Sequence, residues 1–300
     1  ESWTVPEGPN VPWRPPIPGL AHSSPVIWGE HLFVAAAVGQ GEAVLNEVGK
    51  GRTDAYGDVW SLPAEGVQKF EVLCLDKRTG AVLWTKTAFE GEPKFKRHPK
   101  SSYAASTPAA DEGHVVAFFG TEGLYAYDHA GEQLWKKDLG ELNGAFYMAP
   151  TAEWGVGSSP VIFDGRVYLQ VDVIGKSFIA CLDVVTGGEL WRTERGDVPT
   201  WGSPTIDVGR DRTQVIAHGH QTTAGYDAQT GKELWRLVGG GDIPTPTPIV
   251  GSDLIFLTSA HGRLAPIYAV HVDAEGAVSA EAGAEGSENM AWSNPRRGNY

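Results

Sequence analysis

The sequence has few of the features that mark membrane, disulfide-rich or nucleic-acid-binding proteins. No stretch approaches the roughly 18 consecutive apolar residues of a membrane-spanning helix. Lysine and arginine total 24 against 37 aspartate and glutamate residues, a formal net charge of −13, which argues against nucleic acid as a partner. No basic and then apolar segment resembling a signal peptide opens the chain. We therefore expect no transmembrane segment, and a signal or lipid anchor, if the protein has one, precedes Glu1.

What the sequence does contain is a repeated phrase of a small residue, an apolar residue, Asp, a short turn with Gly, and Trp. A supersecondary unit that recurs at a regular interval predicts a repeat architecture. Asp and Gly are expected to shape the turn, and Trp to pack between neighbouring sheets. These residues are therefore predicted to be structural: Asp76, Gly80 and Trp84; Asp128, Gly131 and Trp135; Asp183, Gly187 and Trp191; Asp227, Gly231 and Trp235; and Trp292 in a fifth unit whose turn is degenerate.

Each unit can be read as four short strands. In the third unit the segments are 159–162, 166–171, 177–182 and 189–192, with a tight Asp164-Gly165 turn after the first. Tight turns within a unit and longer connections between units predict an up-and-down meander. The fold class is therefore predicted to be all-β, a β-propeller of four-stranded antiparallel blades. A solenoid is the disfavoured alternative.

The number of units sets an expectation about the ring. Five units follow an N-terminal segment, residues 10–14, which is predicted to be an outer strand with Trp13 in the position of a blade Trp. Eight residues after Trp292 are too few to supply the missing strands of a further blade. We therefore expect residues 1–300 to form a single, incomplete propeller domain, about five full blades plus partial ones, the N-terminal part of a ring of seven or eight blades. A closed ring of five blades is the alternative. Residues 39–70 are read as a loop insertion in the first blade.

The blade phrase resembles the pyrroloquinoline-quinone-like (PQQ-like) propeller repeat, in which Leu-Asp…Thr-Gly…Trp is the tryptophan docking motif. Residues 17–25 and 98–103 further resemble a non-enzymatic, BamB-like branch of that family. The resemblance implies a bacterial protein that is extracytoplasmic, either periplasmic or secreted. It also implies a non-catalytic binding or scaffold role with a protein partner of unknown identity, no cofactor and no catalytic residue.

A binding site is expected on the face that carries the long loops. The connections 85–105, 136–157, 192–202 and 236–246 should emerge together there, and elaborated loops on a rigid scaffold are where binding residues concentrate. Residues just before each inner strand should ring the central funnel. The candidate funnel or partner-binding residues are His22, Lys100, Trp154 and Trp201, and simple packing is the alternative explanation for each.

Two other functions are weighed against the scaffold. A quinoprotein dehydrogenase, by the family resemblance, holds its quinone on a disulfide of adjacent cysteines and binds calcium beside a catalytic Asp. The two cysteines here, Cys74 and Cys181, occupy equivalent positions of separate units, so both are predicted to be free and buried. A carbohydrate- or peptide-binding propeller would use the funnel aromatic residues. His218 and His220 lack an identifiable third ligand for a zinc site.

Overall fold

The computed structural model describes residues 11–39, 61–63, 66–259 and 262–296. Within these residues almost all regular structure is β-strand, and the helical content is two single-turn 3₁₀ helices, η1 (Gly120–Glu122) and η2 (Ser287–Asn289). The strands form five sheets that follow one another in chain order. The prediction of an all-β fold is confirmed.

Each sheet contains a four-stranded antiparallel meander, which we call a blade. Blade 1 has the strand order β1-β2-β3-β4, and blades 2 to 4 repeat this order. The strands are β1 (Val26–Trp28), β2 (His31–Gly39), β3 (Gln68–Asp76) and β4 (Val82–Gly91) in blade 1; β5 (Ala109–Ala110), β6 (Val115–Phe118), β7 (Leu124–Tyr127) and β8 (Gln133–Lys137) in blade 2; β9 (Val161–Phe163), β10 (Arg166–Val171), β11 (Ser177–Asp183) and β12 (Glu189–Arg195) in blade 3; β13 (Thr205–Val208), β14 (Thr213–Ala217), β15 (Thr222–Asp227) and β16 (Glu233–Val238) in blade 4; and β17 (Ile249–Gly251), β18 (Leu254–Thr258), β19 (Ile267–His271) and β21 (Met290–Asn294) in blade 5.

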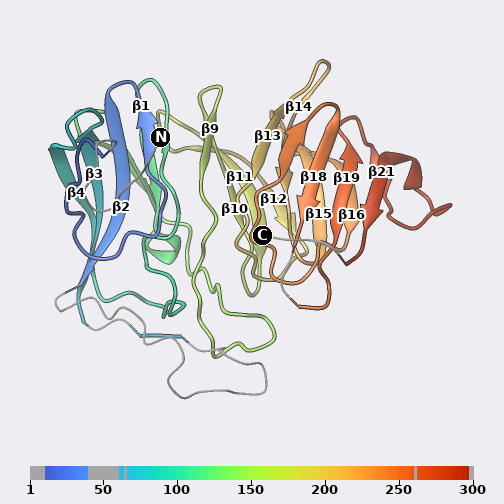
Figure 1. Cartoon of the computed structure of the whole chain (residues 1–300), viewed down its shortest axis with the longest axis horizontal. Coiled ribbons are helices and arrows are strands. Elements are labelled where there is room, and N and C mark those ends of the chain that lie inside the picture. The colour runs from blue at the N-terminus through green and yellow to red at the C-terminus, as the bar shows by residue number, and fades with distance from the viewer. Residues whose placement is uncertain (1–10, 40–60, 64–65, 260–261, 297–300) are drawn as a thin grey trace.

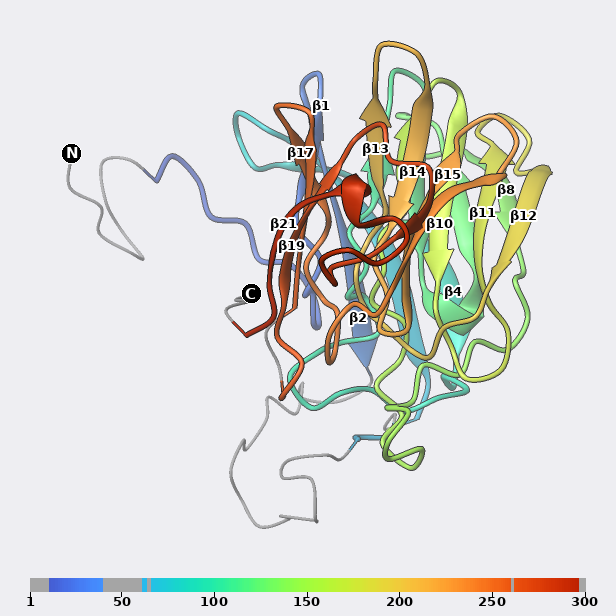
Figure 2. The same cartoon turned by 90° about the vertical axis from the view of Figure 1, so that its right-hand side faces the viewer.

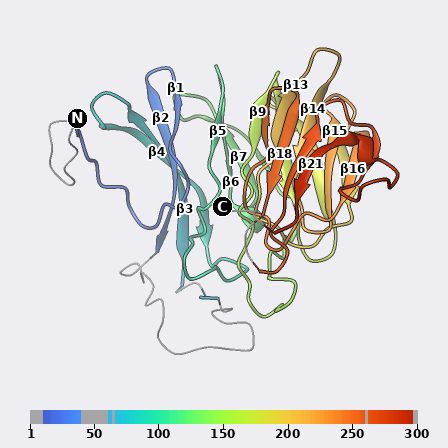
Figure 3. The same cartoon turned by 45° about the vertical axis from the view of Figure 1, so that its right-hand side comes forward.

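The blades stand side by side around a common axis, as Figures 1 and 3 show from two directions. The first strand of each blade contacts the first strand of the next, which places β1, β5, β9, β13 and β17 innermost. The five repeat tryptophans lie in five different sheets, each in the outermost strand of its meander. This is the arrangement that the repeat phrase predicts for a propeller.

The Asp of the phrase shapes the turn between the third and fourth strands. The Asp76 carboxylate accepts hydrogen bonds from the Thr79 amide and hydroxyl, both at 2.8 Å, and Asp183 and Asp227 hold Thr186 and Thr230 in the same way. Such side-chain to backbone bonds stabilise the turn locally. The turn of the second unit is one residue shorter and lacks the Thr. Asp128 instead accepts a hydrogen bond from the Glu132 amide at 2.8 Å.

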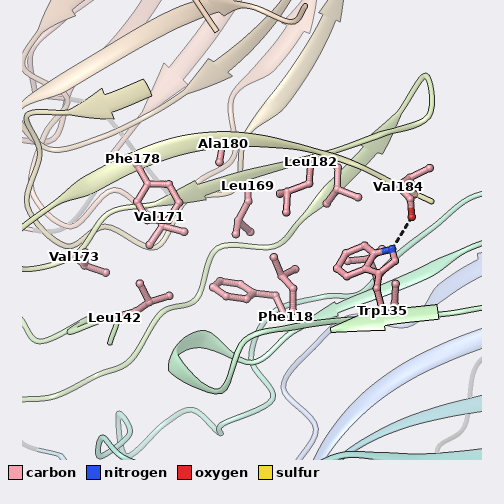
Figure 4. Packing of buried hydrophobic residues seen from close by; sticks show 14 residues of the cluster. Phe118, Trp135, Leu142, Leu169, Val171, Val173, Phe178, Ala180, Leu182 and Val184 are labelled. Carbon is pink, nitrogen blue, oxygen red and sulfur yellow. Dashed lines mark hydrogen bonds between the residues drawn. The ribbon is translucent and has the colours of Figure 1, made fainter. Parts of the chain in front are cut away.

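Trp84, Trp135 and Trp191 each join their own blade to the next one, whereas the Trp235 indole bonds Gln214 of its own blade. The Trp135 indole N–H donates to the Val184 carbonyl of blade 3 at 2.8 Å, and its ring covers Gly187, where an added Cβ would lie 2.6 Å from the ring. Figure 4 shows this indole at one end of the apolar layer between blades 2 and 3. The equivalent bonds run from Trp13 to Lys77 O, from Trp84 to His129 O and from Trp191 to Ala228 O.

The core consists of successive apolar layers between the blades. Blades 1 and 2 share a layer around Phe33, Phe70 and Tyr125, and blades 2 and 3 share one around Phe118 and Leu169. Further layers lie between blades 3 and 4 and between blades 4 and 5. Because blades 2 to 4 bury both faces against neighbours, their middle strands are almost entirely apolar rather than alternating.

The Ser/Thr-Pro segment that opens each unit ties the innermost strands together. The backbone amide of Ser24 donates to the Thr107 hydroxyl at 3.0 Å, Thr107 to Ser159 at 2.9 Å, and Ser159 to Ser203 at 2.9 Å. The hydroxyl before the proline in one blade therefore accepts a hydrogen bond from the backbone amide of its counterpart in the preceding blade. This chain of bonds explains the hydroxyl residue before the proline in the second, third and fourth units.

The N-terminal segment differs from its prediction. Residues 11–18 form no strand, because Pro12, Pro15, Pro16 and Pro18 have no N–H to donate to a ladder. Trp13 nevertheless docks on the turn of blade 1, and with Ile17 it packs on the face of blade 1 that has no preceding blade. Within the described residues, Trp13 pairs with blade 1 rather than with the blade that contains Trp292.

Blade 5 departs from the other units after its third strand. The chain leaves β19, forms β20 (Gly276–Val278), passes through η2 and returns as β21. Strand β20 pairs in parallel with β16, with Trp235 opposite Gly276, so that it extends the outer edge of blade 4. Figure 2 shows η2 and its flanking segments on the outside of the neighbouring strands. The late Trp292 is therefore explained by an excursion to the preceding blade.

Most of the predicted insertion in blade 1 lies outside the described residues. Gly39 and residues 68–70, at its predicted ends, belong to β2 and β3, because the ladder continues to the pair Gly39 and Gln68. Residues 61–63 are described, and Leu62 exchanges two backbone hydrogen bonds with Arg97, both at 2.9 Å. This end of the insertion therefore lies against the connection between blades 1 and 2.

The two cysteines are free and buried, as predicted. Cys74 lies in β3 and Cys181 in β11, the third strands of blades 1 and 3, so blade 2 stands between them. Burial raises the pKa of both thiols to about 11. At neutral pH both therefore behave as small apolar side chains rather than nucleophiles.

Candidate functional site

The connections between blades gather at one end of the propeller, the lower end in Figures 1 and 2. Thirteen residues from four of them line one cavity of about 290 Å³, which we call the rim pocket. Its volume is at the lower end of the range for small-ligand sites. The lining residues are Lys96, Arg97, His98, Ser101, Ser102 and Ala105 after blade 1; Trp154, Gly155, Val156 and Gly157 after blade 2; Trp201 after blade 3; and Ile243 and Thr245 after blade 4.

The structure brings two of the four predicted site residues together. Trp154 and Trp201 both line the rim pocket, with ring centroids 5.3 Å apart. Lys100 is exposed and stands beside the pocket, where its amide donates to His98 Nδ1 at 3.0 Å. His22 is exposed and is not among the lining residues. The predicted face therefore carries a cavity, and the two tryptophans are the predicted residues that form its wall.

Both tryptophans are held in place by several neighbours. Trp154 stacks on Phe146 at 4.8 Å between centroids and meets His98 edge-on at 4.9 Å. The Trp201 indole N–H donates to Gly155 O at 2.9 Å, and its backbone amide donates to Pro244 O at 3.0 Å. Half-buried and fixed aromatic rings provide a rigid contact surface at a small cost in side-chain entropy.

The loop that carries Trp154 folds back on itself. Ala145 pairs with Glu153, and the Phe146 amide donates to Ala152 O at 2.9 Å. At the base of the loop an added Cβ on Gly144 would lie 2.3 Å from Gly155 O, so that only glycine permits this close approach of the backbone. The sequence around Trp154 therefore specifies a compact loop.

The connection after blade 1 makes one side of the pocket positive. Lys96 and Arg97 line the cavity, and Lys100 stands beside it. The Lys96 ammonium and amide bond the Glu153 carboxylate at 3.3 and 3.0 Å, and Arg97 donates to Ser101 O at 2.8 Å. Residues 94–98 are one of two short basic clusters in the sequence, the other being Arg296 and Arg297, and a basic run by itself is usually a solvated surface. Only the fold shows that two of its cations face a cavity.

Two histidines respond to this positive environment. The pKa of His98 is lowered to about 4, first by burial and then by the charges of Lys100 and Arg97. Burial and Arg97 also lower the pKa of His22. His98 is therefore neutral at pH 7, and the positive charge at this side of the pocket comes from lysine and arginine.

Ile243 lines the pocket with a strained backbone. Its φ is +45°, in the left-handed region that β-branched residues avoid. The other non-glycine residues with positive φ in the described chain are Asp and Ser in hairpin turns. Such strain costs about 1–3 kcal/mol and persists where the surroundings enforce it. Here the flanking residues do so, because Asp242 accepts the amides of Arg263 and Leu264, and Pro244 accepts that of Trp201.

A buried polar network lies directly behind Trp201. The Thr200 hydroxyl donates to the Asp172 carboxylate at 2.6 Å, and Arg195 Nε donates to the same carboxylate at 2.9 Å. Arg195 also donates to Tyr226 OH at 3.1 Å and faces Asp197 at 3.6 Å. Burial opposes the charged guanidinium, and the carboxylates of Asp172 and Asp197 outweigh it, so the pKa of Arg195 is raised. The network fixes the connection that carries Trp201.

His218 and His220 make hydrogen bonds that account for both rings. His218 is buried between Thr223 Oγ1 at 2.8 Å and Thr258 O at 3.1 Å, and His220 Nδ1 bonds Gly241 O at 2.9 Å. Among the described residues, no group of three or more His, Cys, Asp or Glu side chains is arranged to hold a metal ion. Both histidines therefore have a structural explanation within the protein.

Stability is expected to fall as the pH falls from about 6.5 to 4. Burial lowers the pKa of His218 to about 4. Between pH 6.5 and 4 this histidine therefore binds a proton in the unfolded chain but not in the folded protein. The linked loss is about 3 kcal/mol for this group. We expect urea unfolding to show a smaller loss for His218→Gln between pH 7 and 4.5 than for the wild type. Parallel curves for the two proteins would assign the acid sensitivity to other groups.

The residues that the structure describes do not fit a quinone and calcium site of the kind found in quinoprotein dehydrogenases. Such a site needs a disulfide of adjacent cysteines, and Cys74 and Cys181 are buried in separate blades. The calcium ion needs a set of oxygen ligands, and the described residues contain no cluster of three acidic or other metal-binding side chains. We therefore derive no chemistry through a quinone.

Comparison with known families identifies the repeat. The family model described as "Outer membrane protein assembly factor BamB" matches residues 68–265, about two thirds of the chain. The chain belongs to this BamB family. The match covers the four-stranded meanders of blades 2, 3 and 4 completely, together with the outer half of blade 1 and the first two strands of blade 5. No curated protein sequence matches the chain.

Three solved structures resemble parts of this chain. BamB from Moraxella catarrhalis is 15% identical over 76% of this chain and 60% of its own, with a TM-score of 0.47. A europium-containing methanol dehydrogenase is 14% identical over 84% of this chain and 48% of its own, with a TM-score of 0.48. A protein of unknown function from Bacteroides caccae is 13% identical over 68% and 66%, with a TM-score of 0.42. The chain thus spans 60% of the BamB chain and about half of the dehydrogenase.

Proposed function

We propose that this member of the BamB family is a non-catalytic binding propeller that captures a protein partner at the rim pocket. The observation that carries the proposal is the convergence of four separate connections on one cavity with two fixed tryptophans in its wall. Aromatic residues that are preorganised in a concave site are the usual anchors of protein recognition. The positive charges beside them would select and orient a partner of opposite charge.

The location we propose is outside the cytoplasm of a bacterium. The description of the family as an outer membrane protein assembly factor supports this location. The described residues include no helix with the length and apolar character of a membrane span. A scaffold role is supported by the fixed arrangement of the blades, in which Trp84, Trp135 and Trp191 each bond the following blade.

Site-specific photo-crosslinking in the source bacterium tests the binding proposal. A photoreactive residue is placed at Thr245, which is exposed and lines the pocket, and at Glu112, which is exposed in the hairpin between β5 and β6 at the opposite end. We expect a discrete protein adduct from position 245 that disappears when Trp201→Ala is added. Equal adducts from both positions, or none from position 245, would refute the pocket as the binding site.

A direct assay separates the scaffold from a quinoprotein enzyme. The purified chain is incubated with the quinone and calcium, and alcohol-dependent reduction of a dye is followed. We expect no turnover, because the described residues do not offer the ligands of a quinone site. Stoichiometric quinone binding with turnover would replace the scaffold proposal with the enzyme.

A further inference from the structure

The rim pocket combines an apolar wall with a cationic one. Trp154, Trp201 and Ile243 provide the apolar surface, and Lys96 and Arg97 lie on the side formed by the connection after blade 1. A cavity of about 290 Å³ accommodates a large side chain rather than a folded domain. The pocket therefore suits a ligand in which a bulky apolar group is joined to a negative charge.

The cations at the rim pocket contrast with the negative charge of the chain as a whole. The protein has a net charge of −13, so an acidic partner is repelled by most of its surface. Three cations nevertheless occur within residues 96–100: Lys96, whose ammonium pairs with Glu153 at 3.3 Å, Arg97, which lines the cavity, and Lys100 beside it. Burial, and then the charges of Lys100 and Arg97, lower the pKa of His98. An acidic segment would thus be attracted electrostatically to this part of the surface. This attraction would select acidic ligands and orient them in the pocket.

The strained backbone at Ile243 supports a role in ligand contact. Glycine or asparagine would adopt a φ of +45° with less strain. The isoleucine instead places a branched apolar side chain in the pocket wall, on the connection whose Pro244 accepts the amide of Trp201. Strain held at a concave site is a common feature of ligand-binding positions.

We propose that the rim pocket binds an acidic peptide segment, whose bulky apolar side chain lies between Trp154, Trp201 and Ile243 and whose neighbouring carboxylate lies against Arg97 and Lys100. This inference rests on the proposed binding function and names the chemistry of the partner. The apolar side chain supplies most of the affinity, as buried aromatic anchors do. The carboxylate selects acidic sequences over basic ones.

Selection from a displayed library of random twelve-residue peptides on the immobilised full chain tests the inference. We expect the enriched peptides to share an aromatic or large aliphatic residue next to Asp or Glu. Affinity for an enriched peptide should fall about tenfold or more in Trp201→Ala and in Lys100→Glu. The matched control is Lys232→Glu, which makes the same charge change at an exposed turn on the opposite end. It should leave affinity within about twofold, because exposed charges beyond a Debye length are screened.

The outcomes distinguish the inference from the broader proposal. Enrichment of basic or uncharged peptides, or equal loss of affinity in Lys100→Glu and Lys232→Glu, overturns the acidic ligand. No enrichment above the Trp201→Ala surface overturns it as well. If an adduct still forms at position 245 in the cell, the binding function stands with a partner of different chemistry. Thermal unfolding of each variant shows whether a loss reflects the pocket or the fold, and Lys100→Glu, at an exposed side chain, provides the readout if Trp201→Ala does not fold.

Discussion

Replacing Arg195 with methionine is expected to lower the free energy of unfolding by about 3–5 kcal/mol. The side chains of Arg195 and its partner Asp172 are both fully buried, with 0% exposure. Methionine fills much of the space but leaves the carboxylates of Asp172 and Asp197 without their cation. The cost arises mainly from these uncompensated buried charges. Urea unfolding followed by tryptophan fluorescence measures the change.

A neighbouring arginine on the same strand provides the control. Arg192 forms an ion pair with Glu189 at 2.7 Å, and both side chains are about one third exposed. Arg192→Met is expected to change stability by about 1 kcal/mol or less, since solvent screens such pairs. Adding Asp172→Asn to Arg195→Met should restore part of the loss. If Arg195→Met and Arg192→Met were equally mild, the buried network would not hold the connection that carries Trp201.

Replacing Trp135 with alanine is expected to destabilise the protein by about 3–5 kcal/mol. The indole is 8% exposed, packs between blades 2 and 3, and donates to Val184 O. Its removal leaves a cavity against Gly187 and unpairs the Val184 carbonyl, whose bond to the indole is drawn in Figure 4. Because the blades are joined mainly by these layers, the loss should lower the cooperativity of unfolding. Calorimetry measures both effects.

Trp292 supplies the comparison for Trp135 because it holds the same place in its unit. It is 46% exposed and contacts Phe256 at 6.2 Å between ring centroids, so Trp292→Ala should cost far less. The same interface can be tested from the turn. Gly187 and Gly165 have φ of +67° and +69°, but only Gly187 has a tryptophan ring within 4 Å of an added Cβ. A similar cost for Gly187→Ala and Gly165→Ala would contradict docking as the source of stability.

The fold could be predicted from sequence because its determinants are local and repeated. The Asp of each turn bonds residues within four positions of itself, and the docking Trp follows at a nearly constant distance. The strands of blade 3 coincide closely with the predicted ones, apart from the extension of β12 to Arg195. That extension depends on Asp172 and Tyr226, which are distant in sequence, so no local pattern could reveal it.

The candidate site was only partly predictable. Trp154 and Trp201 stood out because they lie outside the repeat phrase, and the repeat placed their connections on one face. Lys96, Arg97 and Ile243 carried no such signal, since a short basic run and a single isoleucine are common on loops. Their role depends on how four connections pack together, and on a backbone conformation of Ile243 that sequence does not show.

Strand β20 links blades 4 and 5, because it lies between two strands of blade 5 in the chain and pairs with the outer strand of blade 4. By pairing with β16 it hides backbone groups at the rim of the fourth sheet that would otherwise be open to pairing with another chain. It also makes the fourth sheet depend on residues that the ribosome adds roughly forty positions later, beyond β19. Blades 4 and 5 should accordingly unfold as one cooperative unit. During synthesis, the fourth sheet can be completed only after most of blade 5 has left the ribosome.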